Sequence, residues 1–195
     1  MARRVFFSFH YQNDIWRVNQ VRNSGEFGDV TGTDTFYDNS LWEEAKKKGD
    51  AELKKLIAGG MNNSSVTTVL AASATWGRKW VRYELLKSFE RGNGLMTLWI
   101  DQVKDVEKKT TTRGFDPLAC IYFQLSTDGK TAATQYYDGK AWNALETISA
   151  ASICKAARDA KKGRLSDFAS SHAWRAGNAK EFAGWADAAA KAAGR

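Results

Sequence analysis

The stretch SVTTVLAASATWGRKWVRYEL, residues 65–85, decides the fold class. Its first eight residues are mostly β-branched or small, with no strict polar alternation, which is typical of a strand buried on both faces of a parallel sheet. A short turn follows at 73–77, after which Trp80, Val81 and Leu85 recur at helical spacing. A buried strand that leads through a turn into a helix is the repeating unit of α/β proteins.

The same unit recurs on both sides of this stretch. Apolar runs predict further strands at 4–9, 35–37, 95–100 and 119–125, and helical spacing predicts helices at 10–23, 40–57 (with a break at Gly49) and 142–160. Short strands alternating with helices predict a flavodoxin-like, doubly wound parallel sheet of five strands in the order 2-1-3-4-5, covering residues 1–160. A long polar loop at 102–116 and a small hairpin at 126–140 interrupt the pattern.

Residues 161–195 are predicted to form a helical C-terminal appendage. Nine of the last twenty residues are alanine, which suits close helix packing. Phe168, Trp174, Phe182 and Trp185 are the aromatic side chains through which it would pack on the domain, with a role in structure or assembly.

Composition excludes several classes of protein. The 195 residues contain 43% hydrophobic residues, enough for one sizeable core, and no apolar run approaches the roughly 20 residues of a membrane span, so a cytoplasmic protein with no membrane partner is expected. Two cysteines and two distant histidines give no disulfide framework and no metal site. The net charge of +7 is spread over short basic runs, which favours a solvated surface suited to an anionic ligand over a nucleic-acid binder.

The predicted fold indicates where a ligand would bind. In an open doubly wound sheet, ligands bind beyond the carboxyl ends of the strands where the strand order reverses, here between the first and third strands. The residues that the strand ends bring there are Ser8, Phe9, His10, Tyr11, Asp38, Asn39 and Trp76. The helix after the third strand begins near Arg78, so Arg78 and Arg82 lie where a helix N-terminus already favours an anion such as pyrophosphate.

Sequence motifs for other nucleotide chemistry are missing. No Gly-x-Gly-x-x-Gly follows the first strand, and neither a P-loop nor a Gly-x-Ser-x-Gly elbow occurs, which disfavours redox Rossmann, P-loop and serine-hydrolase functions. The clustered aspartates of a response regulator are replaced by Phe9, His10 and Tyr11 at the end of the first strand.

Two segments carry a family resemblance. VFFSFHY, residues 5–11, resembles the opening strand of TIR domains, and SATWGRKWVRYEL, residues 73–85, resembles their third-strand-to-helix segment. Both lie in the right order on a matching ladder of strands and helices. The variant with Ser-Phe-His-Tyr and Trp-Val-Arg-Tyr-Glu is most similar to the stand-alone TIR-like proteins of bacterial Thoeris anti-phage defence, over roughly residues 4–160.

The resemblance implies an enzyme that cleaves the nicotinamide–ribose bond of NAD. The product would be a cyclic or conjugated ADP-ribose derivative, a signal that activates an effector protein. By position the catalytic carboxylate is Glu84, which would stabilise an oxocarbenium-like ribose. The cationic leaving group needs no general acid, so NAD is the substrate and no cofactor or metal is implied. A phage-derived trigger and a homo-oligomer also fit the resemblance.

Each candidate binding residue has a structural alternative. Phe9, Tyr11, Trp76 and Tyr83 would stack on adenine or nicotinamide, or pack in the core. His10 would orient the ribose or cap a strand end, and Asp38 and Asn39 would bind ribose hydroxyls or cap the next helix. The main alternative for the whole protein is a non-catalytic TIR-like interaction module, and nucleic-acid sensing is a third hypothesis.

Overall fold

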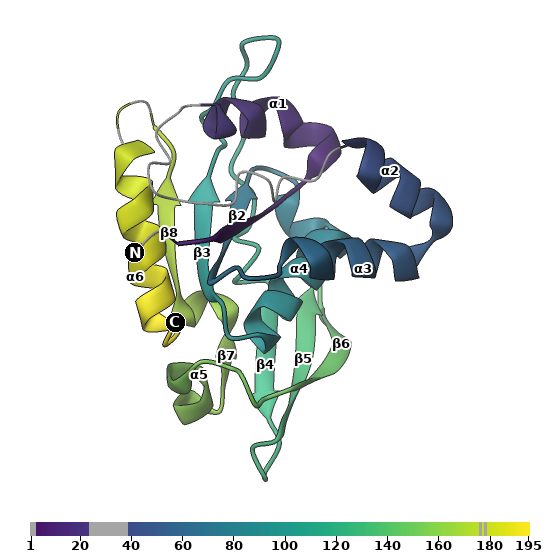
Figure 1. The fold of residues 1–195 in the computed structure, drawn as a ribbon, viewed down its shortest axis with the longest axis vertical. Helices are drawn as coiled ribbons and strands as arrows, with labels where there is room; N and C mark the ends of the chain where they lie inside the picture. Colours follow the sequence, from purple (N-terminus) through teal and green to yellow (C-terminus); the bar gives the residue numbers. More distant parts are fainter. Residues whose placement is uncertain (1–2, 24–38, 176, 178) are drawn as a thin grey trace.

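The chain forms two separate sheets (Figure 1). The computed structural model describes residues 3–23, 39–175, 177 and 179–195. Within this part of the chain, a parallel sheet has the order β1-β2-β3-β8, and an antiparallel sheet has the order β6-β5-β4-β7. The parallel strands are β1 (Val5–Phe9), β2 (Val66–Ala71), β3 (Gly94–Trp99) and β8 (Ala169–Ala173), and the antiparallel strands are β4 (Ile121–Leu125), β5 (Thr131–Tyr137), β6 (Trp142–Ser149) and β7 (Lys162–Arg164).

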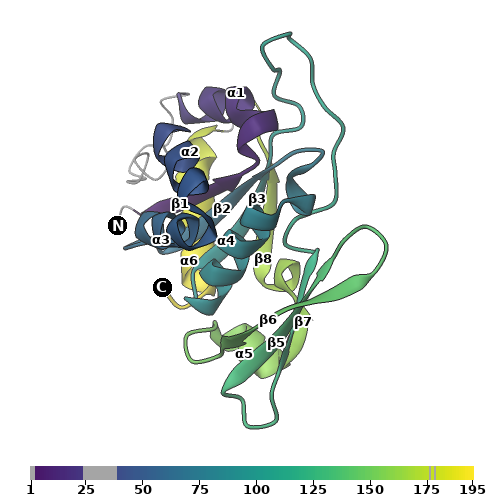
Figure 2. The same cartoon turned by 90° about the vertical axis from the view of Figure 1, so that its right-hand side faces the viewer.

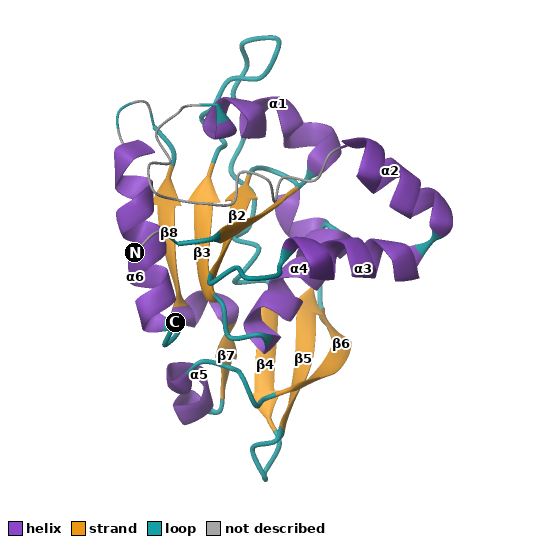
Figure 3. Ribbon diagram, in the orientation of Figure 1, coloured by secondary structure: helices purple, strands orange, loops and turns teal. Residues whose placement is uncertain are grey.

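Helices cover both faces of the parallel sheet (Figure 3), as the doubly wound fold predicts. Leu70 of β2 packs in one core with side chains of α1 and α6, whereas its neighbour Val69 packs in a second core with side chains of α4. Consecutive residues of a strand point to opposite faces, so a continuous apolar run serves both cores. The helical elements are α1 (Tyr11–Arg22), α2 (Asn39–Lys48), α3 (Asp50–Gly60), η2 (Thr75–Gly77), α4 (Lys79–Glu90), α5 (Lys155–Ala160), η3 (Leu165–Phe168), η4 (Ala179–Glu181) and α6 (Phe182–Ala192).

The strand order confirms the prediction for the three strands expected at 4–9, 65–72 and 95–100. β1, β2 and β3 are neighbours in the predicted order, and Gly49, with a φ of 105°, separates α2 from α3 as expected. The strand expected at 35–37 lies outside the described residues, so the described parallel sheet has four strands. None of the described helices is both long enough and apolar enough to cross a membrane.

The prediction of a purely helical segment at 161–195 is wrong. Residues 169–173 form β8, which pairs with β3 in the place predicted for strand five, and residues 162–164 form β7. The sequence Ala-Ser-Ser-His-Ala has no β-branched or aromatic residue, and its side chains are partly exposed at the sheet edge, so propensity gives no strand signal there. The predicted packing is confirmed: Phe182 is buried and stacks on Phe7 with ring centroids 5.7 Å apart.

Two further expectations fail in the second sheet. Residues 119–125 were expected in the parallel sheet, but β4 pairs with antiparallel neighbours and alternates between buried Ile121 and Phe123 and more exposed residues. Residues 142–160 were expected to form one helix, but they form β6 and the short α5. A register shift in β5–β6 places Leu145 and Ile148, three residues apart, against the same core, so a β-bulge imitates helical spacing.

The second sheet packs against α4, the helix that also packs on the parallel sheet (Figure 2). Phe89 of α4 contacts Phe123 of β4 with ring centroids 4.9 Å apart, and the backbone N–H of Ser149 donates to the Glu90 carboxylate at 2.9 Å. Lys87 pairs with Glu146 of β6 at 3.3 Å. The position of α4 is therefore fixed from two sides.

The loop at 102–116 contains no helix or strand, as predicted, and α1 holds it in place. Arg17 donates to the carbonyl oxygens of Val103 at 2.9 Å and Lys109 at 3.1 Å, and to the carboxylate of Asp105 at 3.0 Å. At the far end of the loop, Gly114 lies so close to the backbone of Ser73 that an added Cβ would sit 2.3 Å from its carbonyl oxygen. The loop thus braces the turn between β2 and α4.

Candidate active site

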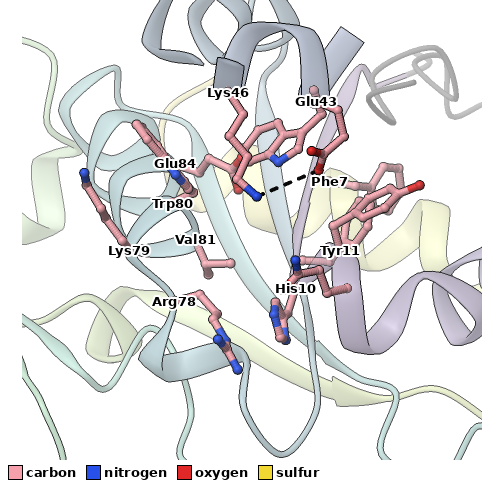
Figure 4. A pocket seen from close by; sticks show the side chains of 13 residues that line it. Phe7, His10, Tyr11, Glu43, Lys46, Arg78, Lys79, Trp80, Val81 and Glu84 are labelled. Carbon is pink, nitrogen blue, oxygen red and sulfur yellow. Dashed lines mark ion pairs between the residues drawn. The ribbon is translucent and has the colours of Figure 1, made fainter. Parts of the chain in front are cut away.

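A pocket lies beyond the carboxyl end of β1, between α1, α2 and the start of α4 (Figure 4). This is the position that the fold predicts for a ligand. Its walls combine aromatic rings with a few charged groups. The lining residues are Phe7, Phe9, His10, Tyr11, Gln12, Trp42, Glu43, Lys46, Arg78, Lys79, Trp80, Val81 and Glu84.

Glu84 is the buried carboxyl group of this pocket. It lies in the second turn of α4, is only 4% exposed, and accepts a hydrogen bond from the Ser8 hydroxyl at 2.5 Å. Burial raises the pKa of Glu84 from 4.5 to about 8, while the hydrogen bond from Ser8 acts in the opposite direction. Because burial penalises the charged form, the site favours a ligand that brings a positive charge to this carboxyl group.

His10 lies at the opposite end of the pocket, beside Arg78 (Figure 4). It is the N-cap residue of α1, and its buried Nδ1 has no hydrogen-bond partner within the described residues. Burial, and then the positive charge of Arg78, lower the pKa of His10 to about 4. The imidazole is therefore neutral near pH 7 and can take part in a hydrogen bond to a ligand without carrying charge.

Aromatic rings form the two side walls. Phe9 and Tyr11 lie on one side with centroids 6.2 Å apart, and Trp42 and Trp80 meet edge to face on the other at 6.3 Å. Such walls suit the flat face of a heterocyclic ring. On α2, Lys46 pairs with Glu43 at 4.0 Å, and both residues line the pocket together with Trp42.

The structure brings together about half of the predicted site residues. Phe9, His10, Tyr11, Arg78 and Glu84 line the pocket. Ser8 is fully buried behind Glu84 and contacts its carboxyl group. Asp38 lies outside the described residues, and Asn39 begins α2 without a described side chain.

Three predicted residues do not line the pocket. Trp76 packs edge to face on Phe115 with centroids 5.1 Å apart, and the guanidinium of Arg82 lies 4.0 Å from the ring centre of Tyr136. Tyr83 does not line the pocket but packs against Trp80 at 5.8 Å. The geometry of α4 explains the difference for Arg82: residues four apart share a helix face, as Trp80 and Glu84 do, whereas a residue two positions away points to the other side.

The sequence prediction missed the wall supplied by α2. Trp42, Glu43 and Lys46 line the pocket from a helix that was expected only as a structural element. The signal in the sequence was Trp42 itself, an aromatic residue in a helix that is otherwise mostly polar. A large apolar side chain on such a helix needs a partner, and here the partner is Trp80.

This arrangement suits the stabilisation of a positive charge that develops next to a sugar or ring. An ionised Glu84 in an apolar setting interacts strongly with a nearby cation because water does not screen it. Three cations line the pocket: Arg78, Lys79, which pairs with Asp50 at 2.5 Å, and Lys46, which pairs with Glu43. An anionic part of the same ligand would bind nearest Arg78. No cluster of three metal-ligating side chains occurs among the residues described.

Comparison with known proteins gives two matches. Residues 6–105 match the family described as Thoeris protein ThsB, TIR-like domain. The chain is also similar to a curated protein of Bacillus cereus (strain MSX-D12) named "Putative cyclic ADP-D-ribose synthase ThsB1". The two sequences are 40% identical over 166 residues, which cover 85% of this chain and 86% of that protein.

Proposed function

The chain belongs to the TIR-like family of the Thoeris protein ThsB, and on this premise we propose that it cleaves the nicotinamide–ribose bond of NAD to make a nucleotide signal. The product is an ADP-ribose derivative, cyclic or conjugated, that activates an effector protein in anti-phage defence. The name of the Bacillus cereus relative supports a cyclic product. The observation that carries the proposal is the buried Glu84 carboxyl group in an aromatic-walled pocket.

The chemistry requires one negative charge near the ribose. When the bond between the ribose carbon and the nicotinamide nitrogen breaks, its electron pair leaves with the neutral ring, and positive charge develops on the ribose. An ionised Glu84 stabilises that charge, and a nucleophile then attacks the same carbon. Nicotinamide departs without protonation, so a single carboxylate suffices and NAD is a substrate that needs no further cofactor.

The other lining residues would bind the rest of the dinucleotide. Arg78 and Lys79, at the start of α4, would hold the pyrophosphate, because a helix N-terminus and two cations favour an anion there. The ring walls, Phe9 with Tyr11 and Trp42 with Trp80, would hold the heterocycles. A phage-derived trigger and assembly with further copies of the chain are parts of the same proposal.

The test is nicotinamide release by the purified chain. Incubation with NAD, followed by chromatography and mass spectrometry, should show nicotinamide and an ADP-ribose-derived product, with lysate from infected cells added in a parallel reaction to supply a trigger. Glu84→Gln should reduce nicotinamide release at least about a hundredfold, because the amide keeps the shape but lacks the charge. The control is Glu90→Gln, on the same helix but outside the pocket.

Two results would contradict the proposal. A folded Glu84→Gln protein with wild-type turnover would remove Glu84 from the reaction. A wild-type protein that releases no nicotinamide, with or without infected-cell lysate, would favour the alternative of a non-catalytic TIR-like interaction module.

A further inference from the structure

We propose that Ser8 is a positioning residue, whose hydroxyl donates the hydrogen bond that holds the Glu84 carboxylate in place for catalysis. This inference rests on the proposed function. It concerns a residue that the sequence places among substrate-binding candidates but that the structure places behind the pocket wall. Ser8 acts through Glu84 and does not itself line the cavity.

The geometry of Ser8 leaves little freedom in either partner. Ser8 is fully buried in β1, and its backbone is held in register with Val69 of β2 by the parallel ladder. Its Oγ lies 2.5 Å from Oε2 of Glu84, on a helix 76 residues further along the chain. Because the strand is rigid, the bond fixes the direction of a side chain that would otherwise choose among several rotamers.

Because Glu84 is buried, this hydrogen bond affects the ionisation of its carboxyl group more than a hydrogen bond at the surface would. Glu84 is nearly inaccessible to water, and Ser8 is the one group whose hydrogen bond favours its charged form in the described structure. Burial raises the pKa of Glu84, and the hydrogen bond from Ser8 lowers it, so the bond reduces the rise. Removing the hydroxyl should therefore leave less ionised carboxylate at neutral pH.

Other titratable or charged groups also face the cavity that Glu84 lines. They are His10 and Tyr11 at the start of α1, Glu43 and Lys46 on α2, and Arg78 and Lys79 at the start of α4. The described structure contains no ion pair between Glu84 and any of these cations. All six groups remain in the Ser8 variants, so a change in the Glu84 titration reports the lost hydroxyl.

A second buried serine provides a matched control. Ser88 lies one turn further along α4, is fully buried, and also links a strand to this helix. Its hydroxyl accepts from Thr67 of β2 at 2.7 Å and donates to the backbone carbonyl of Glu84 at 2.7 Å. Ser88→Ala thus removes a similar buried hydroxyl without touching the carboxyl group.

The first measurement is the pH profile of kcat/KM for NAD cleavage. Ser8→Ala should move the acid limb upward by about one pH unit, because a hydrogen bond to a charged group is worth about one to two pKa units. At pH 7 kcat should fall about tenfold with little change in KM. In Ser8→Cys, which keeps a weaker hydrogen-bond donor, the acid limb should lie between those of the wild type and Ser8→Ala. Ser88→Ala should leave the acid limb unchanged. An unchanged acid limb in Ser8→Ala would overturn the inference.

The second measurement needs no catalysis. The infrared band of the protonated Glu84 carboxyl group, assigned by its loss in Glu84→Gln, can be titrated in the protein without substrate. Its midpoint should be higher in Ser8→Ala than in the wild type and in Ser88→Ala, and equal midpoints would contradict the role given to Ser8. If the wild type releases no nicotinamide while the midpoint still shifts, the proposed function fails and the hydrogen-bonding role of Ser8 stands.

Discussion

Glu84, the proposed catalytic group, shows at the scale of one residue how a buried carboxyl group lowers the stability of the fold. Its carboxyl group titrates near pH 8 in the folded chain and near its ordinary value of 4.5 in the unfolded chain. Between these values the folded protein binds the proton more tightly, so folding stability falls as the pH rises from about 5 to 8. Below pH 4.5 both states are protonated and this loss of stability is absent.

This linkage predicts that Glu84→Gln stabilises the protein at high pH. A neutral amide does not titrate, so the gain in the free energy of unfolding should be larger at pH 8 than at pH 5 by about 2 kcal/mol or more, since one pKa unit corresponds to about 1.4 kcal/mol. Urea denaturation of the wild type and the variant at both pH values measures this gain in the free energy of unfolding, with Glu90→Gln as the control. Equal gains at the two pH values would mean that Glu84 is not desolvated in the folded protein.

The arginines at the start of α4 give a second prediction at the residue scale. Arg78 lines the pocket, whereas Arg82 lies over the ring of Tyr136 outside it. Arg78→Ala should raise KM for NAD about tenfold with a smaller effect on kcat, because an anion-binding group contributes mainly uniform binding. Arg82→Ala should leave KM unchanged and is the matched control. Equal KM values for the two variants in steady-state kinetics would contradict the assignment of Arg78 to the pyrophosphate.

At the scale of elements, α2 completes the pocket that β1 and α4 begin. Trp42 of α2 faces Trp80 of α4, so the wall exists only when these two helices are docked. α4 in turn is held between the parallel sheet and the second sheet. The two helices are therefore anchored differently. α4 is fixed by two cores, whereas α2 is joined to α4 through a small cluster that contains Phe6, Ile57 and Met61.

Removal of the α2 wall should weaken substrate binding. Trp42→Ala deletes one of the two rings on that side, and we expect KM for NAD to rise about tenfold, since aromatic stacking on a base contributes about 1–3 kcal/mol. The control is Trp16→Ala, a tryptophan of α1 that is 51% exposed and does not line the pocket. If Trp16→Ala and Trp42→Ala have the same effect on KM, the α2 wall does not contact the substrate.

At the scale of the whole molecule, the C-terminal segment belongs to the main sheet. β8 extends the parallel sheet beside β3, and α6 covers one of its faces through Phe182, Ala186 and Ala190. Trp174 is also buried in this core. A chain without these residues would expose to water the part of this apolar sheet face that α1 does not cover.

A chain that ends at residue 160 should therefore fail to fold and should be inactive. Loss of α6 and β8 removes much of one core, a larger cost than the usual 5–15 kcal/mol of total stability can absorb. Circular dichroism and size-exclusion chromatography should show an unfolded or aggregated protein. The full chain with Lys191→Ala, an exposed position on α6, is the control. A truncated chain that is monomeric, cooperative in unfolding and active would show that the segment is dispensable.

The sequence alone determined the strands and helices that have a strong local pattern of apolar residues. The strands β1, β2 and β3 are mostly apolar and buried on both faces, and helices with regular spacing, α1 and α4, follow β1 and β2. Their order and the crevice beyond β1 could therefore be predicted. The place of Glu84 came from the strand–turn–helix segment and its resemblance to TIR domains. These features depend on local pattern, which a sequence records directly.

Only the tertiary structure decided the features that depend on a distant partner. Residues 169–173 are a strand because the edge of β3 offers them hydrogen bonds, and the helix-like spacing of Leu145 and Ile148 arises from a bulge opposite β5. The bond between Ser8 and Glu84 joins residues 76 positions apart. Backbone pairing, bulges and buried hydrogen bonds take their energy from groups that are remote in sequence, so no local pattern predicts them.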